Sequence, residues 1–336
     1  MLNISSLKKY DTEKMYEIYD KWPEIALKSY KSIQTPVCFD EINHIIFAGM
    51  GGSGAIGDIF ASVLSKSKIH VNIVKGYLLP KTVDAKTVVV IISVSGNTVE
   101  TLSVLESAQK LNCKIISFSS GGHILEYCKK NKIEHRIINK YHSPRASFTS
   151  YLYTMLKVLH KTLGIKEEDI VESISELEKI NKKICSSNLT DSNPSLNLAK
   201  WITGVPMVYY PFGLESASIR FKNSLQENSK MHVFSEDVME ACHNGIVAWE
   251  KKSNVQPILI QGQDDYIKTK DIWNVLKEFL VKNNIDYKEI FSVEGSILSK
   301  IINLIYLLDY ATIYKAILDE IDPSPVKSID FIKKRI

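Results

Sequence analysis

The chain has few cysteines, and they are not spaced like a disulfide framework or a zinc site. Five of its 336 residues are cysteines: Cys38, Cys113, Cys128, Cys185 and Cys242. Their number is odd, and no pair has the Cys-x-x-Cys spacing of zinc-binding or redox motifs. We therefore expect reduced thiols, as in a cytoplasmic protein.

Long apolar runs and a strong charge of one sign are also missing. We expect no apolar run long enough to span a bilayer, and the first 22 residues are charged and amphipathic rather than signal-like. The formal net charge is only +4, and the lysines at 129–132 are typical of a solvated helix end. These absences predict a cytoplasmic protein without a membrane or nucleic-acid partner.

Strand-like and helix-like segments alternate through most of the chain after a helical beginning. Hydrophobic residues make up 45% of the sequence, enough for a core in each of two domains. The expected strands are 44–48, 70–74, 87–93, 114–118, 135–138, 206–210, 256–261 and 288–291. This alternation predicts an α/β fold with two doubly wound domains, each a parallel sheet flanked by helices. The predicted parts are a helical segment (1–40), a first domain (41–150), and a helical linkage with a second domain (151–336).

The segment VVVIISVSGNTVETL at 88–102 combines an apolar strand with a polar loop and the start of a helix. The loop contains Ser93, Ser95, Gly96 and Thr98. Hydroxyls and backbone amides at a helix N-terminus bind phosphate, and the missing Walker-type lysine favours a small phosphorylated metabolite over a nucleoside triphosphate. The same residues are common in ordinary turns and helix caps, so this loop alone does not distinguish a phosphate site from a simple turn.

A second loop of the same kind follows the strand HIIFA at 44–48. It reads GMGGSG at 49–54 and leads into a helix that we expect to start near Ala55. A side chain in place of Gly51 or Gly52 would block the close approach of a ligand to the backbone. Two such strand–loop–helix units place both loops at the carboxyl edge of one parallel sheet. Together they favour a phosphate site over a pair of simple turns.

Four ionisable side chains become candidates once a phosphorylated sugar is the expected ligand. Arg145 follows the last strand of the first half, with a surface salt bridge as the alternative. Glu227 lies in a helix, with a solvated carboxylate as the alternative. His243 precedes a turn that would present its ring outward. Lys333 by itself is typical of a frayed basic tail.

Several motifs together resemble the sugar isomerase (SIS) domain proteins. They are GMGGSGAIGD at 49–58, SVSGNTVET at 93–101, ENSK at 227–230, HN at 243–244 and the C-terminal IDPSPVKSIDFIKK. The order and coverage, from about residue 40 onward, are most similar to the bifunctional phosphoglucose/phosphomannose isomerases of archaea and some bacteria. The first two motifs are common to SIS proteins, and the later ones narrow the resemblance to these isomerases.

The resemblance implies an enzyme with two SIS domains that interconverts glucose 6-phosphate or mannose 6-phosphate with fructose 6-phosphate through an enediol. It implies no metal and no organic cofactor. The residues it assigns to phosphate binding are Gly52, Ser53, Ser93, Ser95 and Thr98.

The resemblance also assigns the chemical roles. Arg145 would stabilise the enediolate, and Glu227 would be the base that moves a proton between C1 and C2. His243 would assist ring opening from the second subunit of a homodimer, and Lys333 would act at the ring oxygen. A carboxylate and a cation are the groups that this proton transfer needs, and a histidine suits ring opening near neutral pH.

The sequence departs from the family pattern at several positions. Gln226 stands where the family more often has asparagine, and the family's PE-x-x-HNE context of the histidine contains Met239 and Gly245 here. Lys334 is a neighbouring alternative to Lys333. Two other functions stay open: an SIS-type sensor that binds a sugar phosphate without turnover, and an SIS enzyme for an amino sugar or a pentose phosphate.

Overall fold

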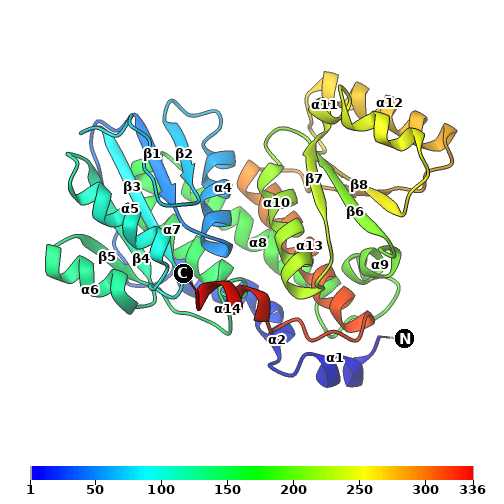
Figure 1. Cartoon of the computed structure of the whole chain (residues 1–336), viewed down its shortest axis with the longest axis horizontal. Coiled ribbons are helices and arrows are strands. Elements are labelled where there is room, and N and C mark those ends of the chain that lie inside the picture. The colour runs from blue at the N-terminus through cyan, green and yellow to red at the C-terminus, as the bar shows by residue number, and fades with distance from the viewer. Residues whose placement is uncertain (1, 336) are drawn as a thin grey trace. The chain divides into compact units, whose positions relative to one another are not determined.

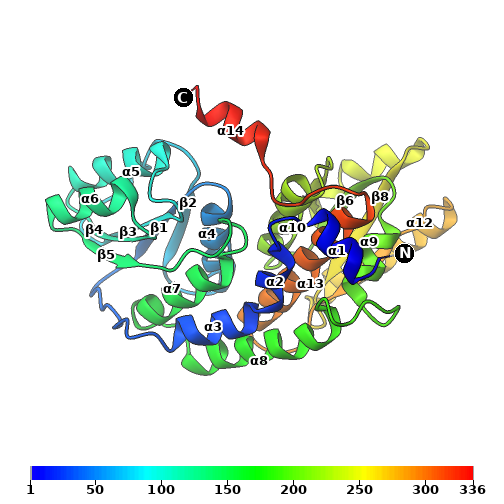
Figure 2. The ribbon, with the colours of Figure 1, turned by 90° about the horizontal axis from the view of Figure 1, so that it is seen from below.

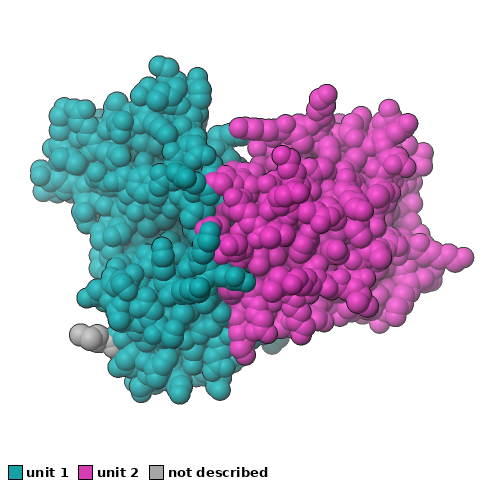
Figure 3. Space-filling model, turned by 180° about the vertical axis from the view of Figure 1, so that it is seen from behind, with its two compact units in different colours: residues 1–20, 177–294, 300–336 teal, residues 21–176, 295–299 magenta. Residues whose placement is uncertain are grey.

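The computed structural model describes residues 2–335 and divides into two compact units (Figure 3). Unit 1 consists of residues 1–20, 177–294 and 300–336, and unit 2 consists of residues 21–176 and 295–299. The helices α8 (Glu167–Ile184) and α13 (Ile297–Leu318) contribute to both units. The boundary near residue 150 stays a prediction.

Unit 2 contains a five-stranded parallel sheet in the order β2-β1-β3-β4-β5 (Figure 1). Its strands are β1 (His44–Ala48), β2 (His70–Val74), β3 (Thr87–Ser93), β4 (Lys114–Ser119) and β5 (Glu134–Ile137). Its helices are α3 (Trp22–Tyr30), α4 (Gly52–Val63), α5 (Val99–Gln109), α6 (Gly122–Asn131) and α7 (Phe148–Leu163). Every residue of β1 and β3 is buried, as expected of central strands that are covered on both faces.

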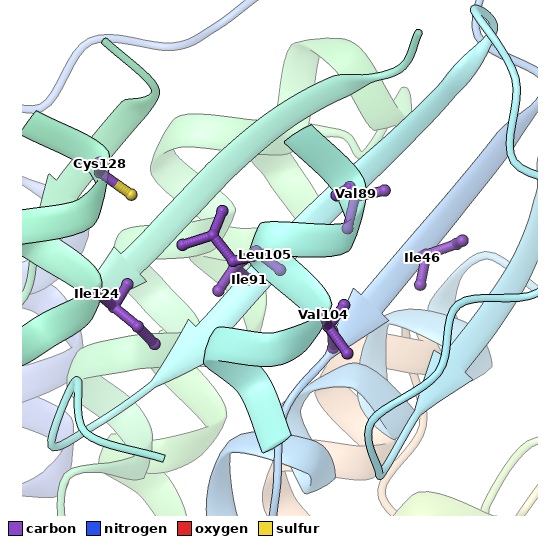
Figure 4. Packing of buried hydrophobic residues seen from close by; sticks show 9 residues of the cluster. Ile46, Val89, Ile91, Val104, Leu105, Ile124 and Cys128 are labelled. Atoms are coloured by element: carbon purple, nitrogen blue, oxygen red, sulfur yellow. The ribbon is translucent and has the colours of Figure 1, made fainter. Parts of the chain in front are cut away.

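Helices cover both faces of this sheet. On one face, Ile46, Val89 and Ile91 pack against residues of α5 and α6, including Leu105 and Cys128 (Figure 4). On the other face α4 contacts the sheet, where the rings of Phe47 and Phe60 stack with their centroids 4.8 Å apart. The predicted doubly wound α/β architecture is confirmed, and the strand positions follow from the apolar runs.

Unit 1 contains a four-stranded parallel sheet in the order β7-β6-β8-β9. Its strands are β6 (Val205–Tyr210), β7 (Phe234–Asp237), β8 (Val255–Gln261) and β9 (Lys288–Phe291). Its helices, α8 and α13 aside, are α1 (Ile4–Tyr10), α2 (Met15–Asp20), α9 (Pro194–Trp201), α10 (Glu215–Asn228), α11 (Val238–Ala241), η1 (Gly245–Glu250), α12 (Ile267–Lys282) and α14 (Lys327–Lys333). Buried residues of β6, β8, α11 and α12 form its core on one face.

Two local features differ from the sequence-based expectation. The strand β7 was not predicted, because its sequence FSED has no apolar run and the strand lies at an edge of the sheet. The helix α4 begins at Gly52 rather than near Ala55. Gly51 precedes it with φ at +52°, a conformation that favours glycine, so the glycine loop turns directly into the helix.

The helix α13 corrects the expectation that no apolar run is long enough to span a bilayer. It has 22 residues, and its most apolar window has a mean hydropathy of 1.4, so by length and composition alone it would pass for a membrane span. That window is 94% buried inside the protein, as in the core helix of a globular fold. The five cysteines are all free thiols, as expected.

His135 in β5 links the last two strands of the unit 2 sheet. Its Nε2 atom lies 2.8 Å from the Ser119 hydroxyl, which donates to the Gly121 carbonyl at 2.9 Å. The hydroxyl proton is thus engaged, and the neutral ring donates to the oxygen. Burial lowers the pKa of His135 from its usual 6.5 to about 4, and the charge of Lys129 acts in the same direction.

This shift predicts a pH-dependent stability. The unfolded chain binds a proton at His135 below about pH 6.5 and the folded chain only below about 4, so the contribution is complete above pH 6.5 and is lost between these values. The free energy of unfolding should fall by an amount on the order of 2 kcal/mol across this window, less than the full shift implies because solvent reaches part of the ring. Urea unfolding of wild type and His135→Asn at pH 7, 6, 5 and 4 measures the difference. His123→Asn, which changes an exposed histidine, is the control. Equal slopes for wild type and His135→Asn would contradict this role of His135.

Candidate functional site

Three loops meet at the carboxyl edge of the unit 2 sheet. They connect β1 to α4, β3 to α5 and β4 to α6, and the three strands are neighbours. The first loop lies against the end of β3: a Cβ atom added to Gly49 would lie 2.9 Å from the carbonyl oxygen of Ile92. The residues that precede α4 and α5, Gly51 and Thr98, make no side-chain hydrogen bond to their helices. At the start of α6, the Asn97 side chain accepts from the His123 amide at 3.0 Å. The sheet thus directs three helix N-termini to one edge, and the backbone amides of the two without a side-chain cap, α4 and α5, favour an anion.

The loop between β3 and α5 is held by its own hydroxyl groups. Ser93 is buried, its Oγ lies 3.0 Å from the Thr98 Oγ1, and it accepts a hydrogen bond from the Gly96 amide at 3.1 Å. Ser95 is exposed, and its Oγ accepts from the Asn97 amide at 3.2 Å. Ser93 therefore shapes the loop from inside, whereas Ser95 is accessible to a ligand.

The loop between β4 and α6, with the sequence SSGGH at 119–123, was not singled out from the sequence. Ser120 donates to the carbonyl of Val94 at 2.6 Å, and the carbonyl of Gly96 accepts from the Ile124 amide at 2.9 Å. Gly96 has φ at +71°, and an added Cβ atom would overlap the Gly121 oxygen. Hydroxyls and glycines directly after a strand, as in the other two loops, were the signal that could have identified it.

The loop between β1 and α4 lies against the chain around Arg145. A Cβ atom added to Gly52 would lie 3.6 Å from the Pro144 carbonyl and 3.7 Å from the Arg145 Cα. Ser53 and Arg145 are each 5% exposed, so Arg145 is not the exposed partner of a surface salt bridge. Unit 2 therefore brings the predicted phosphate-binding residues and Arg145 to one edge of its sheet.

The loop that follows β6 in unit 1 differs in composition from the three loops of unit 2. It connects β6 to α10 through Pro211–Leu214, and its Phe212 is 78% exposed. The first turn of α10 carries Glu215, whose negative charge disfavours an anion at that helix N-terminus. The hydroxyl-rich, glycine-rich loops that suit a phosphate lie in unit 2.

Glu227 lies in the last turn of α10 in unit 1 and is half-buried. The neighbouring Asn228 donates to the Thr312 hydroxyl at 2.7 Å, and Ser229 donates to the Thr312 carbonyl at 2.8 Å. Lys230 has φ at +58° and donates from Nζ to the carbonyls of Glu227 and Pro325, the latter at 2.8 Å. These bonds fix the end of α10 against α13 and the C-terminal segment.

His243 and Lys333 also belong to unit 1, and both are exposed. His243 follows β7 and α11, and therefore lies toward the carboxyl edge of the unit 1 sheet. Glu227 ends the helix that returns from that edge before β7 begins, so it lies toward the amino edge. The structure thus separates Glu227 from His243 within unit 1. Lys333 ends α14, which follows the segment held by Lys230 (Figure 2).

Among the described residues, 2–335, no group of three or more histidine, cysteine, aspartate or glutamate side chains is placed to hold a metal ion. The arrangement offers a phosphate-type cradle in unit 2 and, in unit 1, a half-buried carboxylate at a rigid helix end.

Comparison with protein-family models gives one match in each half of the chain. Residues 39–160 match the SIS domain, and residues 191–336 match the bacterial phospho-glucose isomerase C-terminal SIS domain. Among solved structures, a hypothetical protein from Thermus thermophilus is similar in fold, with a TM-score of 0.71 and 13% identity over 98% of this chain and 88% of that chain.

Curated relatives are similar over most of the length. A bifunctional phosphoglucose/phosphomannose isomerase from Caldicellulosiruptor bescii is 31% identical over 96% of this chain and 98% of its own. A D-glucosamine-6-phosphate 4-epimerase from Sulfolobus acidocaldarius is 30% identical over 73% of this chain and 77% of its own. With the motifs in family order and near-complete coverage of the first relative, the chain belongs to the bifunctional phosphoglucose/phosphomannose isomerase family of SIS-domain proteins.

Proposed function

We propose that this protein interconverts glucose 6-phosphate and mannose 6-phosphate with fructose 6-phosphate through an enediol. The observation that carries the proposal is the edge of the unit 2 sheet, where the N-termini of α4 and α5, both without side-chain caps, lie beside hydroxyl-rich and glycine-rich loops and the backbone of the buried Arg145. Such an edge suits a phosphate dianion. The relatives named phosphoglucose/phosphomannose isomerase support a hexose phosphate as the molecule that carries it.

In this proposal the loops of unit 2 anchor the 6-phosphate. The Gly52 amide, Ser53 and the hydroxyls of Ser95 and Thr98 contact its oxygens, and Ser93 holds the loop in shape. Binding energy from this phosphate is independent of the chemistry at C1 and C2, so it serves to place the reacting carbons. The phosphate end of the substrate is thereby held in place, and the reaction takes place at C1 and C2.

Glu227 is the proposed base at the reactive end. The proton next to a carbonyl is weakly acidic, so its removal needs a carboxylate at the carbon and a positive charge at the developing oxyanion. Glu227 supplies the first and Arg145 the second. The same carboxylate returns the proton to the neighbouring carbon, and return to either face of C2 gives glucose 6-phosphate or mannose 6-phosphate.

His243 and Lys333 are the proposed groups for ring opening, and the working enzyme is a homodimer. Glu227 and His243 lie toward opposite edges of the sheet in unit 1, which supports a site that takes His243 from the partner subunit. We place the reaction in cytoplasmic sugar metabolism, in glycolysis or gluconeogenesis, and we expect no cofactor.

A second candidate function comes from one relative. The chain is 30% identical to a protein named D-glucosamine-6-phosphate 4-epimerase, so an amino sugar phosphate is the alternative substrate. Parallel assays with fructose 6-phosphate and glucosamine 6-phosphate distinguish the two candidates. A sensor that only binds would retain affinity for both without turnover.

The role of Glu227 as the base is tested by activity and binding assays. Purified protein given fructose 6-phosphate without added metal should form glucose 6-phosphate and mannose 6-phosphate, detected by coupled dehydrogenase assays. Glu227→Gln should lower kcat by about a thousand-fold or more, because the amide cannot accept the proton, while fructose 6-phosphate binding by calorimetry stays within a few-fold. Glu178→Gln, at an exposed glutamate of α8, is the matched control. A Glu227→Gln enzyme with a near-normal rate would exclude Glu227 as the base.

The phosphate loop is tested through its central glycine. Gly96→Ala places a methyl group where the Gly121 oxygen lies and forces a side chain into a positive φ. We expect the KM for fructose 6-phosphate to rise about ten-fold or more, equivalent to about 1.4 kcal/mol of lost binding. Gly76→Ala is the control, because its added methyl group would meet nothing within 4 Å. An unchanged KM in Gly96→Ala would argue against phosphate binding at this loop.

The shared site of the proposed dimer is tested by mixing two inactive variants. Glu227→Gln and His243→Ala chains, unfolded and refolded together in equal amounts, should recover about a quarter of wild-type activity. Half of the dimers would be mixed, and one of the two sites in each mixed dimer would hold an intact pair. Mixtures that stay inactive, with mixed dimers confirmed by differential tagging, would place both residues of a site in one chain.

A further inference from the structure

A buried polar network joins α10 to α13 within unit 1. Arg220 of α10 donates from Nε and Nη2 to one carboxylate oxygen of Asp309 in α13, at 2.9 and 2.6 Å. The Ser224 hydroxyl donates to the other oxygen at 2.8 Å. Arg220 is 2% exposed, Asp309 0% and Ser224 3%, so the whole group is removed from water.

The network continues along the same pair of helices toward Glu227. Ser224 lies one helical turn before Asn228, and Asn228 and Ser229 bond Thr312, which lies one turn after Asp309. The residues at 220, 224 and 228 have the i, i+4 spacing that places them on one side of α10. Polar contacts to α13 therefore occur on both sides of the turn that carries Glu227.

A gain in folding stability is a weak explanation for the buried ion pair of Arg220 and Asp309. Two buried charges lose their hydration, and well-packed apolar side chains of similar volume are often as stable or more so. Burial raises the pKa of Asp309, the charge of Arg220 and its hydrogen bonds oppose that shift, and the nearby charge of Glu227 adds to it. Asp309 and Glu227 thus lie close enough for their charges to interact, with Arg220 bonded to Asp309.

We propose that Arg220, Asp309 and Ser224 are positioning residues that fix the last turn of α10, and with it the Glu227 carboxylate, for proton transfer. Directional hydrogen bonds fix the rotation and the sliding of one helix against another, whereas apolar contacts tolerate small shifts. A misplacement of about 1 Å at a reacting group costs about a hundred-fold in rate. This inference rests on the proposed role of Glu227.

The test replaces the ion pair by apolar side chains. The double variant Arg220→Met, Asp309→Leu should keep a melting temperature near that of wild type and a KM for fructose 6-phosphate within about three-fold. Its kcat should fall at least about ten-fold, and the deuterium isotope effect on kcat with C1-deuterated fructose 6-phosphate should rise as proton transfer becomes slower. Arg220→Lys, which keeps the charge and one bond, should recover part of kcat.

The matched control is the ion pair Lys315–Asp319, which joins the last turn of α13 to the residue that follows the helix at 2.7 Å. Lys315→Met, Asp319→Leu should leave kcat unchanged. If the Arg220→Met, Asp309→Leu variant does not fold, Ser224→Ala tests the positioning role instead. We expect its kcat to fall several-fold. If the wild-type enzyme is active and the variants have the same kcat, this inference is wrong and the proposed function stands. If the wild-type protein does not turn over the sugar phosphates, both the inference and the proposed function are wrong.

Discussion

The fully buried strand β3 is the element on which the unit 2 site depends. It pairs in parallel with β1 on one side and β4 on the other, and all of its residues from Thr87 to Ser93 are shielded from water. Parallel pairing makes each of these strands end at the same edge, so the helices that follow must begin there. The resulting concentration of backbone amides is a consequence of topology, and it exists before any particular side chain is considered.

Glycine then decides how closely the loops pack at that edge. Gly96 adopts a positive φ and lies so near the Gly121 carbonyl that no Cβ atom fits between them. The carbonyl of Gly96 accepts from the Ile124 amide near the start of α6, which ties one phosphate-type loop to the helix of the next. The loops therefore form one rigid surface, and in our account this surface holds the phosphate while Glu227, at the rigid end of α10, carries out the chemistry.

Much of this could be predicted from the sequence, because the decisive signals are local. The apolar runs of β1 and β3 and the serine- and glycine-rich segments after them lie within a few residues of each other. The strand β7 was missed because four largely polar residues at a sheet edge carry no such pattern. The SSGGH loop was missed although its composition matches the other two loops. The Arg220–Asp309 pair could not be predicted, because its partners are 89 positions apart and meet only when α10 and α13 pack.

The proton transfer itself is the central claim, and nuclear magnetic resonance of the reaction in D₂O tests it most directly. Fructose 6-phosphate incubated with the enzyme in D₂O should give glucose 6-phosphate and mannose 6-phosphate that carry deuterium at C2. Fructose 6-phosphate recovered from the mixture should carry deuterium at C1. Products and recovered fructose 6-phosphate that still contain no solvent deuterium after many turnovers at equilibrium would contradict proton transfer through an enediol at Glu227, and the absence of any product would contradict the isomerase activity.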